Sequence, residues 1–349
     1  MREKDSSPKS SLLNATFRSI EEVNEVTHAS GWDGEFRQLA KGRVTSRWHS
    51  LHLGPSVLSC HRLNKRIHVC QTPPGGCVAL AIVPPPYFLL VDGAEVGNHQ
   101  AILMHADSEV DFVVPNESAC ETLAIPQAVF EASSRALFPR MHDVNGRPVR
   151  VFQCVPSRWS ALRREMTRLL RDGQMSPEDF SHLLTGYLDL MAGESENGST
   201  EKRLGNVSVH RIARRAQEYI EAHYPGTIRM EDLCRYTGVS LRSLQRCFAE
   251  YFQVSPSDYI KSRRLHAARQ GLVAADSSHL TVTQIASASG FTHLGRFSVE
   301  YRDYFDESPR ETLAECGRRV GADPFRRDGW PPSRFNKAPE PGACRGSLS

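Results

Sequence analysis

The sequence predicts an α+β chain in which an N-terminal part of short β-strands with helices is followed by an all-helical C-terminal part. Three observations support this division. Between residues 36 and 125, short β-prone runs alternate with turns rich in proline and glycine. Residues 193–207 are polar and contain glycine and serine, which is typical of a linker. Beyond this linker, residues 208–315 contain one helical pattern twice.

Length and composition limit the class of protein. With 349 residues, 40% of them hydrophobic, the chain can hold two domains and a linker. It has no run of 18 apolar residues and begins with a charged, polar stretch rather than a signal peptide, so we expect a soluble, cytoplasmic protein without a membrane partner. Nine cysteines show no Cys-x2-Cys spacing, so we expect no zinc site, no disulfide frame and no cofactor. The expected segments are an N-terminal segment at 1–35, a β-domain at 36–125, a helical region at 126–192, a linker at 193–207, a helical domain at 208–315 and a disordered tail at 316–349.

Short strands at regular spacing make a β-barrel or a β-sandwich the expected form of the β-domain. We expect strands at residues 57–63, 77–83, 87–91, 101–104 and 110–114. Helices are expected at 127–137 and 157–170, and a third apolar stripe at 180–190 follows the helix-start pattern Ser176-Pro177.

A metal centre in this β-domain would need clustered histidine and carboxylate ligands. The histidines are instead dispersed and favour ordinary core or surface positions, at His61, His68, His99 and His105. We therefore expect no metal site and no catalytic residues.

The first copy of the C-terminal pattern begins with a short helix at residues 230–236. Gly238 can take the left-handed conformation that ends a helix, and Ser240 is a good N-cap for the next one. In that second helix every third or fourth residue is apolar, which predicts one buried stripe formed by Leu244, Cys247, Phe248, Tyr251 and Phe252. A short helix, a glycine turn and a helix with one apolar and one basic face is the pattern of a helix-turn-helix, whose second helix enters the DNA major groove.

The second copy repeats this pattern. A short helix at 283–289 is closed by Gly290, and Thr292 is expected to open the next helix. Its inward side chains are Phe297, Tyr301, Tyr304 and Phe305. A long helix at 259–272 should connect the two copies. One such pattern is weak, since any amphipathic helix pair can imitate it, but two in register are specific. A helical repeat used only for protein contacts is the alternative.

These features resemble the DNA-binding domain of the AraC/XylS family of bacterial transcriptional regulators. The resemblance covers residues from about 211 to 313 and rests on the doubled helix-turn-helix, the connecting Arg264-Leu265 with Ala267, Ala268 and Arg269, the second-unit Ile285-Ala286 with Gly290-Phe291, and the closing Tyr304-Phe305 with Ser308-Pro309.

The resemblance implies the rest of the expected function. It implies that the β-domain is a cupin-like jelly roll that senses a small-molecule effector or mediates dimerisation. It also implies that the helices at 126–192 pair two protomers of a homodimer; packing on their own β-domain is the alternative. The expected partners are double-stranded promoter DNA and RNA polymerase, with activation more common than repression. An alternative of a different class is a ligand-binding or catalytic cupin with a helical appendage.

Base readout should come from the N-terminal part of each recognition helix. In the first unit, Arg242, Gln245 and Arg246 should share one face, with Ser240 and Ser243 beside them. Arginine is the usual bidentate partner of guanine and glutamine of adenine. For Arg242, a phosphate contact is an equal alternative.

The second unit offers fewer hydrogen-bond donors at the equivalent positions, which are Leu294, Gly295, Ser298 and Val299. The family often has Arg or Gln there. We expect Leu294 to meet a thymine methyl group. Phosphate contacts are expected from His293, Arg296 and Arg302. The first unit should therefore dominate sequence discrimination.

Positive charge in the C-terminal domain is local. Residues 211–315 carry 14 Lys and Arg against 13 Asp and Glu, whereas residues 235–269 carry 7 against 2. The tail after Cys316 carries seven against three and little periodicity, so we expect it to be disordered and to contact DNA without sequence preference.

One arginine pair suggests a ligand site. Arg43 and Arg47 are similar to the Arg-x3-Arg half of a motif by which some proteins hold cyclic dinucleotides, since guanidinium groups suit phosphates and guanine edges. The companion Asp/Asn-x-Ser-x2-Gly stretch is missing. Solvated surface arginines are the alternative.

Overall fold

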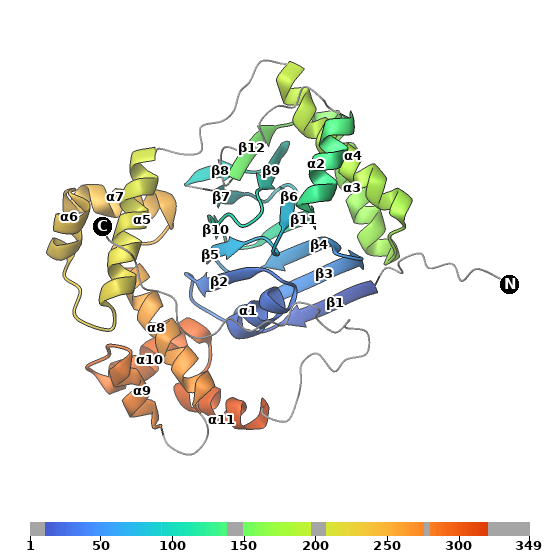
Figure 1. Ribbon diagram of the computed structural model, residues 1–349. Coiled ribbons are helices and arrows are strands. Elements are labelled where there is room, and N and C mark those ends of the chain that lie inside the picture. The colour runs from blue at the N-terminus through green and yellow to red at the C-terminus, as the bar shows by residue number, and fades with distance from the viewer. Residues whose placement is uncertain (1–10, 92, 138–148, 197–206, 276–279, 320–349) are drawn as a thin grey trace.

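The computed structural model describes residues 11–91, 93–137, 149–196, 207–275 and 280–319 (Figure 1). Most of the expected linker, and the tail from residue 320 onward, lie outside these ranges. Within them, helices, two β-sheets and a second group of helices follow one another across the molecule (Figure 1).

Two antiparallel sheets form the N-terminal part. The larger sheet has the order β1 (Ser11–Phe17), β3 (Ser46–Leu53), β4 (Ser56–Leu63), β11 (Ser118–Pro126), β6 (Cys77–Ile82), β9 (Gln100–Met104) and β12 (Val149–Gln153). The smaller sheet has the order β2 (Asp33–Gln38), β5 (Ile67–Thr72), β10 (Val110–Val114), β7 (Leu89–Val91) and β8 (Ala94–Val96). All five predicted strands are present, as β4, β6, β7, β9 and β10.

The sheets stay separate, so the predicted closed barrel or jelly roll is not confirmed. Among the described residues no strand pairing joins one sheet to the other. The edge strand β8 has only three residues and offers little backbone for pairing. The larger sheet also takes in β1 and β12, which lie outside residues 36–125. The β-rich part is therefore a sandwich of two open sheets.

The core between the sheets explains why β6 is apolar throughout. All six β6 side chains are buried because both faces of the larger sheet are covered. On the inner face, Ala79 and Ala81 pack with Val69 and Val110 of the smaller sheet and with helix α1 (Ile20–Ala29).

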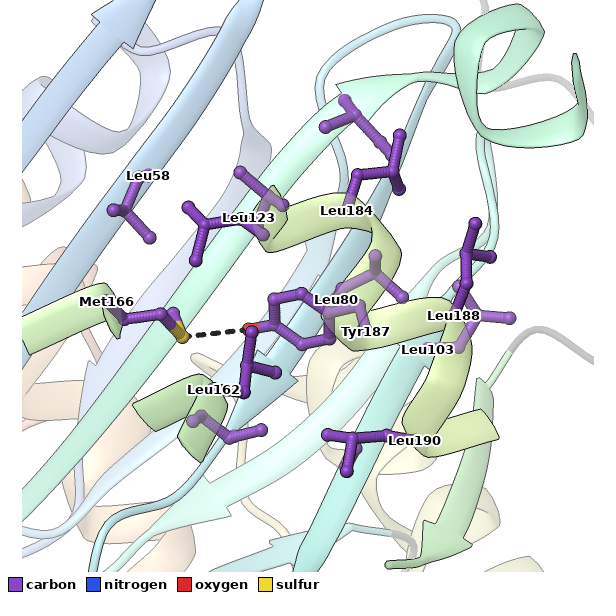
Figure 2. Close-up of a cluster of buried hydrophobic side chains, with 14 of the residues drawn as sticks. Leu58, Leu80, Leu103, Leu123, Leu162, Met166, Leu184, Tyr187, Leu188 and Leu190 are labelled. Atoms are coloured by element: carbon purple, nitrogen blue, oxygen red, sulfur yellow. Dashed lines mark hydrogen bonds between the residues drawn. The ribbon is translucent and has the colours of Figure 1, made fainter. Parts of the chain in front are cut away.

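The outer face of the larger sheet is covered by three helices, α2 (Gln127–Leu137), α3 (Pro156–Asp172) and α4 (Pro177–Glu196). Figure 2 shows Leu80 and Leu123 of the sheet facing Met166 of α3 and Tyr187 of α4. The Tyr187 hydroxyl donates to the Met166 sulfur at 3.4 Å. The apolar stripes of α3 and α4 are thus buried within the chain. This is the packing on their own β-domain that was the alternative to pairing two protomers. Helix α4 also extends into the first residues of the expected linker.

The C-terminal part contains the doubled helix-turn-helix that the sequence predicts. Gly238 ends α6 (Met230–Thr237) with φ 74° and Gly290 follows α9 (Val282–Ala288) with φ 88°, both in the left-handed region. The start of the second unit's recognition helix differs from the prediction. Its N-cap is His293, one residue after the predicted Thr292. The helices of the whole C-terminal part are α5 (Val207–His223), α6 (Met230–Thr237), α7 (Leu241–Tyr251), α8 (Pro256–Ala274), α9 (Val282–Ala288), α10 (Leu294–Phe305) and α11 (Pro309–Arg319).

The smaller sheet joins the two parts. On its outer face, Leu90 and Val113 belong to the same buried cluster as Leu244 and Phe248 of α7 and Tyr259 of α8. The first helix-turn-helix therefore completes its core against the β-sandwich. Figure 1 shows α5 to α7 on the side of the sheets opposite α3 and α4.

Candidate nucleic-acid interface

Helix α7 is the first candidate recognition helix, and its two faces differ sharply. Its start is fixed by Ser240, whose hydroxyl accepts from the backbone N–H of Ser243 at 3.3 Å. The predicted stripe is buried, with each side chain at most 1% exposed, and consists of Leu244, Cys247, Phe248, Tyr251 and Phe252. Burial of this stripe sets the rotation of the helix and turns the opposite face to solvent.

That opposite face presents Arg242, Gln245 and Arg246, all exposed. The guanidinium of Arg246 lies 3.7 Å from the carboxylate of Glu250, and both side chains are about half exposed or more, so solvent weakens this pair. Within the described part of the chain, Arg242 and Gln245 have no side-chain hydrogen bond or ion pair. The three side chains are available to base edges or phosphates, as predicted from their spacing.

Helix α10 presents a different surface. Leu294 is 37% exposed and Val299 is 69% exposed. The Ser298 hydroxyl donates to the Leu294 carbonyl within the helix. Arg296 is exposed but is held by Glu300 at 2.8 Å. The outer face of α10 therefore mixes exposed apolar and polar side chains, with His293 as the N-cap before it and the exposed Arg302 near its end.

Close packing fixes the second unit against the first. A Cβ atom at Gly290 would lie 2.2 Å from the carbonyl oxygen of Pro225, in the connection between α5 and α6. The neighbouring Arg264 guanidinium donates to the Gly226 carbonyl at 2.7 Å. Lys261 of the connecting helix α8 pairs with Glu300 of α10 at 2.9 Å. These contacts hold the two recognition helices in a defined relation.

Much of the local positive charge turns inward. Arg263 and Arg269 of α8 are buried, at 9% and 6% exposure. Arg263 pairs with Glu221 at 2.6 Å, while Arg269 pairs with Glu21 and Glu307 at 2.8 and 2.7 Å. The excess of seven over two in the sequence therefore overstates the charge on the exposed surface, because a count along the chain cannot separate the two sides of a helix.

Asp111 of β10 joins the smaller sheet to the first unit. Its buried carboxylate accepts from the Tyr251 hydroxyl of α7 at 2.7 Å and from Arg214 of α5 at 2.7 Å, and it lies 3.1 Å from His68. Burial opposes ionisation, but the facing His68, Tyr251 and Arg214 hold the pKa of Asp111 well below its usual range.

The second unit is held by the Gln38 backbone at the end of β2. Its carbonyl accepts from the Ser262 hydroxyl at 2.7 Å and from the Tyr304 hydroxyl at 2.6 Å, and His266 lies 3.1 Å away. Burial, reinforced by the nearby Arg37, lowers the pKa of His266 well below its usual range. No sequence pattern indicated these contacts, which join residues more than 220 positions apart.

The predicted arginine pair is divided between two environments. Arg43 reaches the carboxylate of Glu307 in the C-terminal part at 3.7 Å. Arg47 is exposed on β3, where it pairs in register with Arg62 of β4. Neither arginine lines the pocket found between the two sheets.

That pocket is small, at about 70 Å³, and includes Trp48, His61 and Cys120 in its lining. Drug-sized ligands usually occupy about 300 Å³ or more. Within the described ranges, no group of three or more His, Cys, Asp or Glu side chains is placed to hold a metal ion. None of the helices there is both long and apolar enough to cross a membrane.

Comparisons with known proteins agree with the geometry of the C-terminal part. Residues 233–315 match the family model described as "Helix-turn-helix domain". The "Probable thc operon regulatory protein" of Rhodococcus erythropolis is 40% identical over 102 residues, covering 29% of this chain and 31% of that protein. The "XylDLEGF operon transcriptional activator" of Pseudomonas putida is 34% identical over 116 residues, covering 33% of this chain and 35% of that protein. The match thus spans about a third of these relatives.

A shorter relative is covered more fully. The "XylDLEGF operon transcriptional activator 2" of Pseudomonas putida is 33% identical over 116 residues, which are 33% of this chain and 74% of that protein. A solved structure of a probable AraC family transcriptional regulator from Rhodopseudomonas palustris is 38% identical, with a TM-score of 0.28, and the match covers 30% of this chain and 96% of that one. On the sequence match and the doubled helix-turn-helix, the chain belongs to the AraC/XylS family of helix-turn-helix transcriptional regulators.

Proposed function

We propose that this protein is a sequence-specific DNA-binding regulator that activates transcription in response to a small molecule. The observation that carries the proposal is the exposed face of α7, where Arg242, Gln245 and Arg246 stand opposite a fully buried stripe. The arrangement supplies side chains for bidentate hydrogen bonding to guanine and adenine on a helix whose rotation is fixed by its core. Activation is inferred from relatives whose names describe them as operon transcriptional activators.

The two recognition helices have unequal roles in this proposal. Helix α7 discriminates bases by hydrogen bonds, while α10 adds Leu294 against a thymine methyl group and Arg296, Arg302 and His293 near phosphates. RNA polymerase is the expected protein partner of an activator. A homodimer remains part of the proposal, although the apolar stripes of α3 and α4 are used within the chain.

A mobility-shift assay with the full-length protein tests the function. The probe is the DNA upstream of the protein's own gene, and the competitor is random DNA of equal length at about 150 mM salt, because phosphate contacts alone give strong salt-dependent binding. Retention of the upstream probe against excess random competitor is the expected result. Binding that unlabelled upstream DNA and random DNA displace equally would contradict a sequence-specific regulator.

A further inference from the structure

The buried stripes of the two recognition helices align α7 with α10 residue by residue. Four inward side chains of α7 have buried aromatic counterparts in α10 at one constant spacing along the chain. The pairs are Leu244 with Phe297, Phe248 with Tyr301, Tyr251 with Tyr304 and Phe252 with Phe305. Because the same core positions set the rotation of both helices, residues at equivalent outer positions face the same way relative to the core of each unit.

The outer face changes in chemistry between the two helices. At the spacing of the core pairs, the outer residues of α7 and their counterparts in α10 are Arg242 and Gly295, Gln245 and Ser298, and Arg246 and Val299. The Ser298 hydroxyl donates to a backbone carbonyl within the helix, and Val299 is exposed. A face with two guanidinium groups and an amide in the first unit thus presents an isopropyl group in the second. In the DNA major groove, an apolar side chain finds its complement in the C5-methyl group of thymine.

The glycine one turn before Val299 is not required by the part of the chain that the structure describes. A Cβ atom at Gly295 would meet nothing within 4 Å, and the residue is not among those with a positive φ. Glycine weakens a helix relative to alanine, but it allows another molecule to approach the helix backbone closely. On a recognition helix that molecule is DNA, so Gly295 is suited to bring α10 close to the base pairs.

The charged neighbours of Val299 leave this face open. Arg296 is held by Glu300, which also pairs with Lys261 of the connecting helix α8. Arg302 is exposed and follows Val299 by three residues, so it lies one turn further along the same side of the helix. The N-terminal part of a recognition helix contacts base edges, and a cation further along suits a phosphate.

We propose that Val299 is a specificity-determining residue that contacts the C5-methyl group of a thymine, and that Gly295 allows the close approach which this contact needs. The proposal rests on the proposed function and gives α10 a preference for thymine through a residue other than Leu294. Burial of one methyl-sized group changes affinity by about fourfold. A bidentate arginine pair contributes up to about a hundredfold, so α7 remains the main discriminator.

Uracil interference tests the contact with the full-length protein. Deoxyuridine replaces thymine at about one random position in each molecule of the upstream DNA, which removes the C5-methyl group and keeps the base pairing. Bound and free DNA are separated and cleaved at uracil. In the parent protein, DNA that lacks particular thymine methyl groups should be depleted from the bound fraction. Val299→Ala should lose the depletion at one or more of these positions.

The matched control is Val129→Ala, the same change at a valine that is 39% exposed on α2, away from the helix-turn-helix units (Figure 1). It should keep every depleted position of the parent. A probe with deoxyuridine at the single Val299-dependent position should bind the parent about fourfold more weakly than the thymine probe. Val299→Ala should bind both probes equally.

Gly295→Ala tests the close approach separately. Its Tm should be unchanged or higher, because the added Cβ atom meets no other atom of the described chain and alanine favours a helix. Its affinity for the upstream DNA should fall at least threefold. Parental affinity in this variant would overturn the role of Gly295.

The proposed contact of Val299 would be overturned if no thymine methyl group mattered in the parent, or if Val299→Ala kept the same depleted positions as Val129→Ala. The mobility-shift assay separates this result from a failure of the proposed function. Specific retention of upstream DNA without a Val299-dependent thymine refutes only the contact. Loss of specific retention in the unaltered protein refutes the regulator itself.

Discussion

Asp111 is the residue at which the sandwich and the first helix-turn-helix depend most directly on each other. Its carboxylate is 6% exposed and meets side chains from β5, α5 and α7. Removing one partner from a buried ionic cluster leaves the others desolvated and uncompensated. Glu109 pairs with the same Arg214 but is exposed to solvent, so it serves as the solvent-exposed control for the buried Asp111.

Asp111→Asn should lower the free energy of unfolding by about 3 kcal/mol, because Arg214 loses a buried counter-charge. Glu109→Gln should cost less than about 1 kcal/mol, because its side chain is 57% exposed. Urea unfolding of both variants measures the difference. Equal losses would show that Asp111 does not join the two parts in the way described.

Two histidines whose pKa values are lowered in the fold predict the direction of the pH dependence. Burial lowers the pKa of His61 to about 4, and the pKa of His266 is also lowered. The unfolded chain binds protons at these sites more readily, so stability is full above the ordinary histidine pKa of about 6.5 and falls as the pH drops below it. The fall approaches about 1.4 kcal/mol per pH unit for each histidine.

His266→Gln should reduce this loss between pH 7.5 and pH 5.5, since an amide can still donate to the Gln38 carbonyl but takes up no proton. His61 keeps its share of the pH dependence, so the slope becomes shallower without vanishing. Thermal unfolding at several pH values makes the comparison. An identical pH profile for His266→Gln and the parent protein would contradict the assignment.

At the scale of elements, α7 and α10 share an inner aromatic stripe and differ on the outer face. The inner stripes and the glycine turns could be predicted because they depend on periodicity and on backbone conformation, both of which are local. The inward direction of Arg263 and Arg269 could not be predicted, because their carboxylate partners lie far away in the sequence, on α5, α1 and the segment after α10. The N-cap of α10 is His293, one residue after the predicted Thr292.

Two turn glycines separate conformation from packing. Gly238 and Gly290 both have a positive φ, but a Cβ atom at Gly238 would meet nothing within 4 Å. Gly238→Ala should therefore cost about 1 kcal/mol from backbone strain alone. Gly290→Ala should cost clearly more and weaken DNA binding, because its Cβ atom collides with the Pro225 carbonyl. Urea unfolding and DNA titration of both variants test this; similar losses would mean that this close approach does not position the second unit.

At the scale of the whole molecule, both helix-turn-helix units are docked on the sandwich, the first through Asp111 and the second through the Gln38 carbonyl. The sequence predicted the two-part organisation and five of the strands. It did not predict helix α1 or the other seven strands of the described residues, β1, β2, β3, β5, β8, β11 and β12. Strands such as β2 and β3 are rich in polar residues and have no continuous apolar run that would mark them. It left a barrel and a sandwich open, since strand spacing alone does not determine closure, and the structure has two open sheets.

The docked arrangement predicts the size of the protected DNA. If both units enter successive major grooves on one face, their centres are separated by roughly 34 Å, or about 10 base pairs. Hydroxyl-radical footprinting on the upstream DNA should show two protected windows at that spacing for one protomer. A single window would mean that α10 does not enter the DNA.

The central claim is that the α7 face discriminates sequence while α10 mainly adds affinity. The most direct measurement is the ratio of affinities for cognate and random DNA, taken at one salt concentration, for Arg246→Ala and for the matched variant Arg296→Ala on α10. Arg246→Ala should lower that ratio, which corresponds to a loss of about 1–3 kcal/mol in the difference between the two binding free energies. Arg296→Ala should weaken binding to both DNAs by a similar factor. An unchanged ratio in a correctly folded Arg246→Ala protein would contradict the account.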